Sequence, residues 1–169
     1  MAVAASGTLS LSFQNLENLV ANCATFQTWC GAGSAAKAKA NIHYRAVVDP
    51  ASNRPLCVII PNHWRALKVA ETTFSPDHQW TLLFEANVPA LYQSGHEDAF
   101  IVFCNYLGNI FEEMQTLAAS GDYLPVSELT VIGDSVRRSV WEKDANDGDE
   151  DDAGDGDYYQ GEISVVRRV

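Results

Sequence analysis

The spacing of apolar residues changes several times along the chain, and each change predicts a different element. Near the start they recur at helical spacing, so we expect an amphipathic helix that Ser12 caps and that ends before Gly31. Gly31 and Gly33 break the pattern, and residues 35–40 predict one more short helical turn. The apolar positions of the first helix are Phe13, Leu16, Leu19, Val20, Cys23 and Phe26.

From residue 42 the apolar period shifts toward two, the repeat of a β-strand. Residues 42–48 alternate and predict a half-buried strand that stops at Asp49-Pro50. Residues 56–60 are apolar at every position. That run predicts a strand covered on both faces and closed by Pro61, although a buried helix has the same pattern.

The most regular alternation covers residues 80–88, with apolar residues at every second position and mostly polar residues between them. It predicts an antiparallel strand with one solvated face. Residues 65–71 are its expected neighbour, joined to it through a turn over residues 74–78 that contains Pro76-Asp77.

The strongest helical pattern covers residues 97–120, which would form a helix about 35 Å long at ~1.5 Å per residue. Glu97 and Asp98 favour its N-terminus, and Gly121 stands where a C-cap is expected. We expect it to pack across one face of the sheet. Its apolar stripe is Phe100, Phe103, Cys104, Leu107, Ile110, Phe111, Met114, Leu117 and Ala118.

Further strands are expected over residues 128–131, 136–141 and 159–165, and residues 143–157 between them predict a long flexible loop. The elements together predict a single α/β domain of the α+β kind. Its sheet is mostly antiparallel and packs against one long and one shorter α-helix. A chain of 169 residues suits one such domain.

The charge is concentrated in one place. The chain carries a formal charge of −11, and residues 142–157 hold nine acids and one lysine, so most of the charge lies in that stretch. Sequence-specific DNA recognition is not expected, because nucleic-acid affinity depends on Lys and Arg. The start has no signal-peptide pattern and no apolar run approaches ~20 residues, so we expect no membrane association.

No residue set predicts a catalytic or cofactor site. Gly133-Asp134-Ser135 is similar to an esterase nucleophile block, but no histidine follows it, so we interpret it as a turn. The four histidines show no zinc-ligand spacing, and residues 31–37 do not match a phosphate-binding loop. The four cysteines lie in apolar surroundings and are expected to be reduced core thiols.

The acidic stretch is the one candidate for a metal, because clustered carboxylates suit calcium. Asp147, Asp149 and Asp151 are the candidate ligands, although Asp152 stands where a calcium-binding EF-hand loop needs glycine. A solvated run of mutually repelling charges is the simpler interpretation.

The chain resembles the tail terminator proteins of long-tailed bacteriophages, and the resemblance covers most of its length. The segments that carry it are LSFQNLENLVANCATFQTWCGA, FIVFCNYLGNIFEEMQTLAASGDYLPVSELTV and the closing YYQGEISVV. The acidic loop is an atypical addition to that pattern.

The resemblance implies a structural virion protein without a cofactor, assembled in the host cytoplasm. Such a protein forms a homo-oligomeric ring, usually a hexamer, that caps the tail tube, stops its growth and joins the tail to the head. Its expected partners are further copies of the chain, the tail tube protein and the head-side connector or stopper protein. Genomic DNA would pass through the ring without sequence recognition.

In such a ring, sheet edges and the loops around residues 62–64 and 76–80 are expected to contact neighbours. Trp64, His78 and Trp80 are interface candidates, since tryptophan is common in interface cores. Trp80 is equally well explained as a core residue. The acidic candidates, which could line a channel or face a basic partner, are Asp144, Asp149 and Asp155.

Two alternative functions are compatible with the same sequence. A different head–tail connector or head-completion protein would differ in the ring that it touches. A calcium-binding module or small hydrolase is the other class, and it predicts stabilisation by calcium or activity lost in Ser135→Ala.

Deleting residues 144–157 tests the placement of the acidic loop. A solvated insertion contributes little to the core, so the truncated chain should keep its circular dichroism spectrum and cooperative thermal unfolding. Loss of folding would show that the segment is part of the domain.

Overall fold

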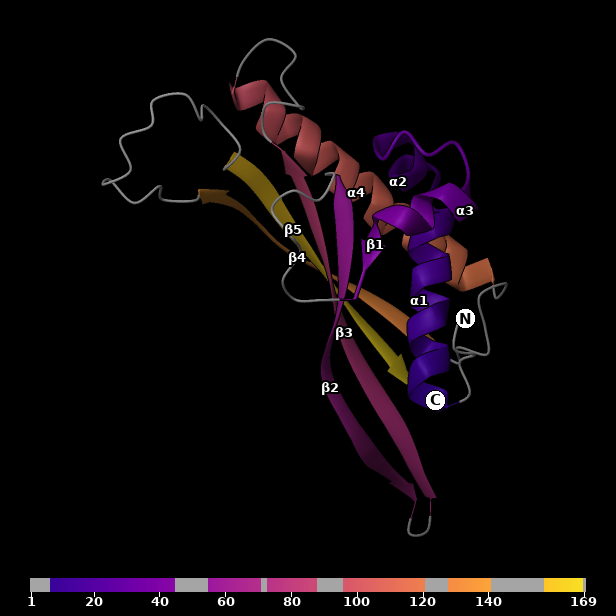
Figure 1. Ribbon diagram of the computed structural model, residues 1–169. Helices are drawn as coiled ribbons and strands as arrows, with labels where there is room; N and C mark the ends of the chain where they lie inside the picture. Colours follow the sequence, from indigo (N-terminus) through magenta and orange to yellow (C-terminus); the bar gives the residue numbers. More distant parts are fainter. Residues whose placement is uncertain are drawn as a thin grey trace, which may run out of the picture.

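Among the described elements, short helices come first, then three strands, a long helix and two last strands, an order close to the expected one (Figure 1). The computed structural model describes residues 7–44, 55–70, 73–87, 96–120, 128–140 and 157–168. The helices are α1 (Thr8–Asn22), α2 (Ala24–Trp29), α3 (Ala35–Ala38), the 3-10 helix η1 (Lys39–Asn41) and α4 (His96–Ser120). The strands are β1 (Ile42–His43), β2 (Leu56–Ala70), β3 (Thr73–Asn87), β4 (Glu128–Val140) and β5 (Asp157–Arg168).

The five strands form one sheet in the order β1-β2-β3-β5-β4. The short β1 is parallel to β2, and every other neighbouring pair is antiparallel. Residues of α1, α2 and α4 share one hydrophobic core with the strands. The expected α+β fold, a mostly antiparallel sheet packed against a long and a shorter helix, is therefore confirmed.

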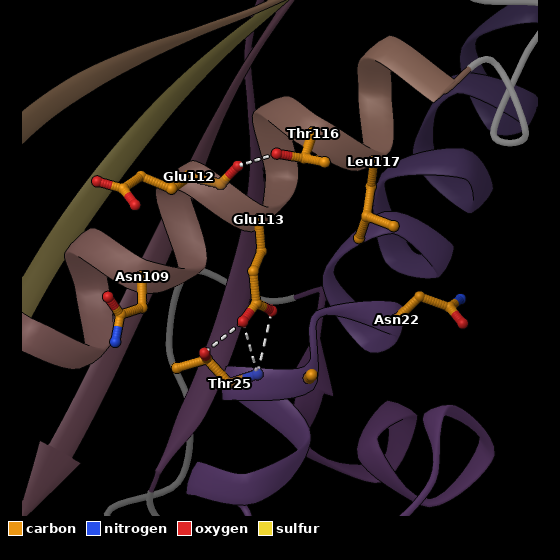
Figure 2. A pocket seen from close by; sticks show the side chains of 8 residues that line it. Asn22, Thr25, Asn109, Glu112, Glu113, Thr116 and Leu117 are labelled. Carbon is orange, nitrogen blue, oxygen red and sulfur yellow. Dashed lines mark hydrogen bonds between the residues drawn. The ribbon is translucent and has the colours of Figure 1, made fainter.

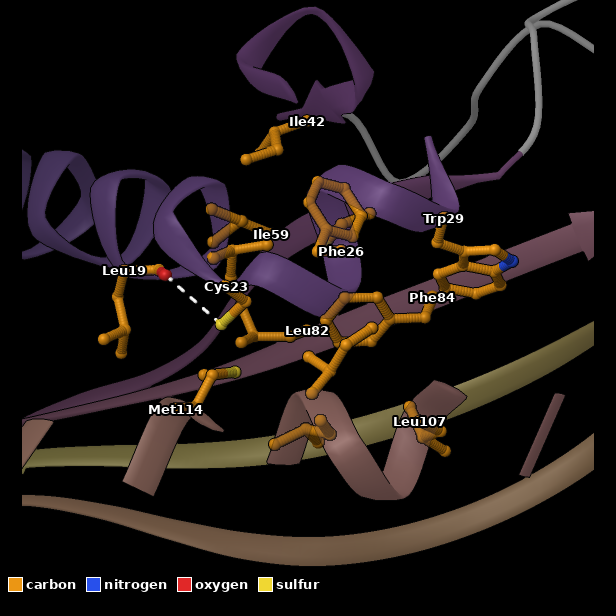
Figure 3. Close-up of a cluster of buried hydrophobic side chains, with 14 of the residues drawn as sticks. Leu19, Cys23, Phe26, Trp29, Ile42, Ile59, Leu82, Phe84, Leu107 and Met114 are labelled. Atoms are coloured by element: carbon orange, nitrogen blue, oxygen red, sulfur yellow. Dashed lines mark hydrogen bonds between the residues drawn. The ribbon is translucent and has the colours of Figure 1, made fainter. Parts of the chain in front are cut away.

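The core lies between α1, α2, α4 and one face of the sheet (Figure 3). The expected alternation in β3 is confirmed, because every second residue from Trp80 to Ala86 is buried. Trp29 of α2 joins the layers: its ring stacks on Tyr106 of α4 at 5.3 Å and contacts Phe84 of β3 at 6.5 Å between centroids. Aromatic contacts of this kind stabilise beyond the area that they bury.

The other face of β3 is less exposed than the alternation predicted. Thr81 and Glu85 are both buried, and Gln160 of β5 donates a hydrogen bond to Glu85 Oε1 at 2.8 Å. The prediction of one solvated face is therefore wrong for this strand. β3 lies between β2 and β5, so its polar side chains are surrounded by neighbours on both sides, including the buried Leu56 and Val58.

The opening helix differs from its prediction at both ends. It begins at Thr8, because Gly7 N donates to Ser10 Oγ at 3.0 Å and Ser10 Oγ donates back to Gly7 O, so Ser12 lies buried inside α1 instead of capping it. It also breaks at Cys23, whose backbone is extended at φ −65° and ψ 119°. The predicted single helix is thus two helices.

The predicted break after α2 is confirmed, because Gly31 and Gly33 have positive φ values of 61° and 66°. The predicted short helical turn is also confirmed as α3 and η1. The predicted strand over residues 42–48 is confirmed for Ile42–His43, and its positions 45–48 lie outside the described residues.

Pro61 does not close its strand, because β2 continues to Ala70. The ladder shifts register between Pro61 and His63, and such a bulge accommodates a residue that has no N–H to donate. The predicted pairing of residues 65–71 with residues 80–88 is wrong, because residues 65–70 pair with residues 73–77 and residues 80–85 pair with residues 56–61. The predicted turn over residues 74–78 is therefore part of β3.

β4 is one strand, and the predicted Gly133-Asp134-Ser135 turn is a register shift inside it, between Gly133 and Val136. β5 begins at Asp157, which pairs with Val140, so the last residue of the predicted loop is the first residue of this strand. The long helix is confirmed as α4, and Gly121 lies outside the described residues. Among the described helices, none has the length and apolar character of a membrane span.

Gly161 allows α4 to approach β5 closely. A Cβ at Gly161 would lie 2.5 Å from Leu107 Cδ2 and 3.2 Å from Phe103 Cε1, and both of these α4 side chains are buried. Gly108, on the exposed side of α4, has no heavy atom within 4 Å of the same position. Position 161 therefore has no space for a side chain, whereas position 108 has.

We expect Gly161→Ala to lower the free energy of unfolding by about 1–3 kcal/mol, because the added methyl overpacks the core. Gly108→Ala is the matched control and should raise it by up to ~1 kcal/mol, since alanine is the better helix former. Urea unfolding of both variants checks the signs. A neutral Gly161→Ala would mean that α4 shifts freely on the sheet.

Candidate assembly interface

The two edges of the sheet are open to different extents. β1 pairs with Cys57 and Val58 of β2, and in the described part of the chain the rest of β2 has β3 as its one partner. β4 is the last strand on the other side and pairs with β5. An edge strand presents backbone N–H and C=O groups that another strand can bind. The two edges are therefore candidate surfaces for assembly.

β2 and β3 also form a long ribbon beyond the rest of the sheet. The β5 ladder with β3 ends at Asp77, which pairs with Arg168, so residues 66–70 and 73–76 pair with each other alone in the described structure. Figure 1 shows this hairpin extending past the end of the sheet. Each strand has 15 residues. At ~3.3 Å per residue such a strand is about 50 Å long.

The structure brings together two of the predicted interface residues. Trp64 of β2 and His78 of β3 are direct cross-strand partners at the base of the ribbon. Trp80, the third candidate, is 3% exposed and packs against Phe13 at 5.7 Å between ring centroids. Its side chain therefore belongs to the core and offers no surface to a neighbour.

The acidic candidates Asp144, Asp149 and Asp155 lie outside the described residues, as do the calcium candidates Asp147 and Asp151. Within the described ranges, no group of three or more His, Cys, Asp or Glu residues could hold a metal ion. The calcium hypothesis therefore stays a prediction.

The four cysteines are free thiols, as expected. Burial raises the pKa of Cys23 and Cys30 to about 12 and raises the pKa of Cys57 well above its ordinary value. These thiols stay protonated at neutral pH and are poor nucleophiles, since the thiolate is the reactive form. They serve as small apolar core residues.

A groove of about 570 Å³ separates the start of α2 from α4 (Figure 2). Glu113 reaches across its floor from α4: its carboxylate accepts hydrogen bonds from Thr25 N at 3.0 and 3.2 Å and from Thr25 Oγ1 at 2.5 Å. The groove is lined by Asn22, Ala24, Thr25, Asn109, Glu112, Glu113, Thr116 and Leu117.

The Glu113 carboxylate acts as the N-terminal cap of α2, because a helix start has backbone N–H groups without helical partners. The sequence did not indicate this contact, since the two residues are 88 positions apart. The Thr25 hydroxyl donates to the Glu113 carboxylate, and the same carboxylate also accepts from Thr25 N, so it is committed to holding α2 on α4. We therefore interpret it as a structural joint.

A second set of polar contacts fixes the residues on either side of β1 onto α1. Tyr44 Oη donates to Glu17 Oε1 at 2.5 Å, and the Tyr44 ring meets Phe13 edge to face at 4.4 Å. Lys39 Nζ lies 3.7 Å from Glu17 Oε2 and donates to Asn18 Oδ1 at 2.6 Å. These contacts hold η1 and β1 against α1 and so position one edge of the sheet.

The chain matches no protein-family model and no curated protein.

Replacing Glu113 with glutamine tests the joint between α2 and α4. We expect Glu113→Gln to lower the free energy of unfolding by about 1–2 kcal/mol, because a charge-assisted hydrogen bond to Thr25 is lost. Glu112→Gln removes a neighbouring exposed carboxylate and should change stability by less than ~0.5 kcal/mol. Equal losses in the two variants, measured by thermal unfolding, would show that Glu113 is no cap.

Proposed function

We propose that this protein is a structural virion protein that forms a ring at the end of a phage tail tube. The ring ends growth of the tube and joins the tail to the connector or stopper protein on the head side. The observation that supports this most directly is the sheet, which has two different edges and a ribbon that projects from one of its ends. The resemblance of the chain to tail terminators supplies the biological setting.

A ring requires contacts between two different surfaces of each copy. When unlike patches meet head to tail and the rotation closes, the assembly stops at a fixed number of copies. The edges formed by β2 and β4 lie on opposite sides of one sheet, so they provide such a pair. Closure then leaves no edge exposed for further growth around the ring.

The two ends of the sheet give the proposed ring two different faces. The β2–β3 ribbon leaves the end at which Asp77 pairs with Arg168. The acidic connection joins the opposite end, where Val140 pairs with Asp157. We assign the ribbon face to the tail tube. The acidic segment either lines the channel, where it would repel passing DNA, or faces a basic head-side partner.

Native mass spectrometry and negative-stain imaging of the purified protein at micromolar concentration test this function. We expect closed rings of one stoichiometry, and we expect their addition to polymerising tail tube protein to stop tube growth. Rings that leave tubes unaffected and bind isolated head connectors would instead favour a connector role. A protein that stays monomeric and binds neither partner would contradict the proposal.

Shortening the ribbon separates ring formation from tube binding. Replacing residues 66–76 with Asn-Gly removes the two-stranded extension and leaves Arg65 paired with Asp77. The variant should unfold within ~3 °C of the parent protein and form rings, because the removed pairs have no third strand in the described part of the chain. It should no longer stop tube growth. Full capping by this variant would show that the ribbon does not contact the tube.

A further inference from the structure

One row of exposed positions runs along the side of α4 that faces away from the sheet. The row consists of Ile101, Asn105, Gly108 and Glu112. Steps of four, three and four residues bring these positions above one another on a single helix face. The buried side chains of α4 lie on the opposite face, where they join the core. We call these four positions the outer α4 row.

Gly108 has no reason within the described structure to be glycine. Apart from the backbone of its own helix, no heavy atom lies within 4 Å of the Cβ that it lacks, and its φ is not positive. Glycine in a helix interior costs about 1 kcal/mol relative to alanine. The missing side chain does allow the backbone of another segment to approach closely. A close contact made in a complex would therefore explain this residue.

The outer α4 row is also poor in charge for an exposed helix face. Residues 99–111 contain no charged side chain, and Ile101 is 55% exposed, the highest value among the large apolar residues that the structure describes. The solvent side of a surface helix usually carries charged residues, whereas the cores of protein interfaces are depleted of charge. The face therefore has the composition of a contact surface.

The groove between α2 and α4 lies beside this row and gives it a polar end. Glu113 on its floor is held by Thr25, whereas in the described structure the Asn109 amide and the Glu112 carboxylate have no hydrogen-bond partner. Figure 2 shows both side chains on the same side of α4, away from the contact between Glu113 and Thr25. Because α4 contains no Lys or Arg, the cation that complements Glu112 has to come from another segment.

We propose that the outer α4 row is the docking site for a basic helix of another protein. This helix crosses α4 at Gly108, where the two backbones approach closely, and covers Ile101 with an apolar side chain. At the other end of the row, a Lys or Arg of the partner helix binds Glu112 and Asn109. Positions 101 and 112 are 11 residues apart, so the contact covers about 16 Å of α4 at ~1.5 Å per residue. The proposed ring uses the sheet edges and the ribbon, so this surface is additional to it.

A second copy of α4 suits this surface less well than a basic helix does. Two copies that cross at Gly108 bring no cation to Glu112, because α4 has no Lys or Arg. Each copy would also add the carboxylates of Glu112 and Glu113 to the same contact, and like charges oppose association. Charge complementarity therefore favours a different, basic partner.

Fluorescence anisotropy with a model helix tests the docking site on the full chain. The probe is a fluorescein-labelled peptide of ~20 residues, built from Ala, Leu and Lys with the Leu and Lys on one helical face. We expect it to bind. Gly108→Leu should weaken binding at least about tenfold by blocking the crossing, and Glu112→Gln about two- to fivefold by removing an exposed ion pair. A peptide with Glu in place of Lys should not bind.

Two further variants separate binding from folding. Gly108→Ala should raise the free energy of unfolding and still lower the affinity for the peptide, because alanine is the better helix former but fills the crossing point. Gln14→Leu adds a leucine at an exposed position of α1 and should bind the peptide as the unmodified chain does. Thermal unfolding of each variant shows that it is folded.

Every other outcome overturns the inference. Binding that Gly108→Leu and Glu112→Gln both retain would show that the peptide uses a different surface. Equal binding of the Glu peptide would remove the argument from charge, and no binding of either peptide would remove the proposed occupant. Dimers of the chain alone that Gly108→Leu abolishes would show that α4 pairs with a second α4 instead.

Discussion

The close approach of α4 to β5 at Gly161 is the constraint on which the rest of the structure depends. With no Cβ at this position, Leu107 and Phe103 enter the sheet surface and bring α4 into contact with the core face. α4 in turn holds α2 through Glu113 and through the stacking of Tyr106 on Trp29. The helical break at Cys23 therefore depends on α4, which contacts α2 and is itself positioned by β5.

This arrangement gathers the helices on one face and leaves the edges of the sheet for other roles. A helix or loop that covers an edge protects a monomeric sheet protein from association. Here the described residues protect β2 with a two-residue β1, and β4 has a partner on one side. Such edges favour aggregation unless a specific partner uses them. The proposed closed ring would supply that partner and would have a fixed size.

The sequence predicted the helices and strands whose apolar periodicity reflects burial on one face. It did not predict the features that depend on contacts between residues far apart in the chain. The alternation in β3 and β5 and the stripe of α4 follow from the core they face. Pro61 and Gly133-Asp134-Ser135 resemble strand ends, yet neighbouring strands continue past them as bulges. For the candidate interface, residue type indicated Trp64 and His78 as individual candidates. Their pairing follows from strand register, which local sequence does not determine.

The polarity of the sheet explains why the proposed ring would end a tube instead of extending it. A tube grows when each added ring exposes the same surface as the ring that it covers. In the proposed ring the ribbons leave one end of the strands, and the connections that begin after Val140 and rejoin at Asp157 leave the other. The face turned away from the tube thus lacks the ribbon. Another tube subunit finds no ribbon to bind there, so growth stops by the absence of a matching surface.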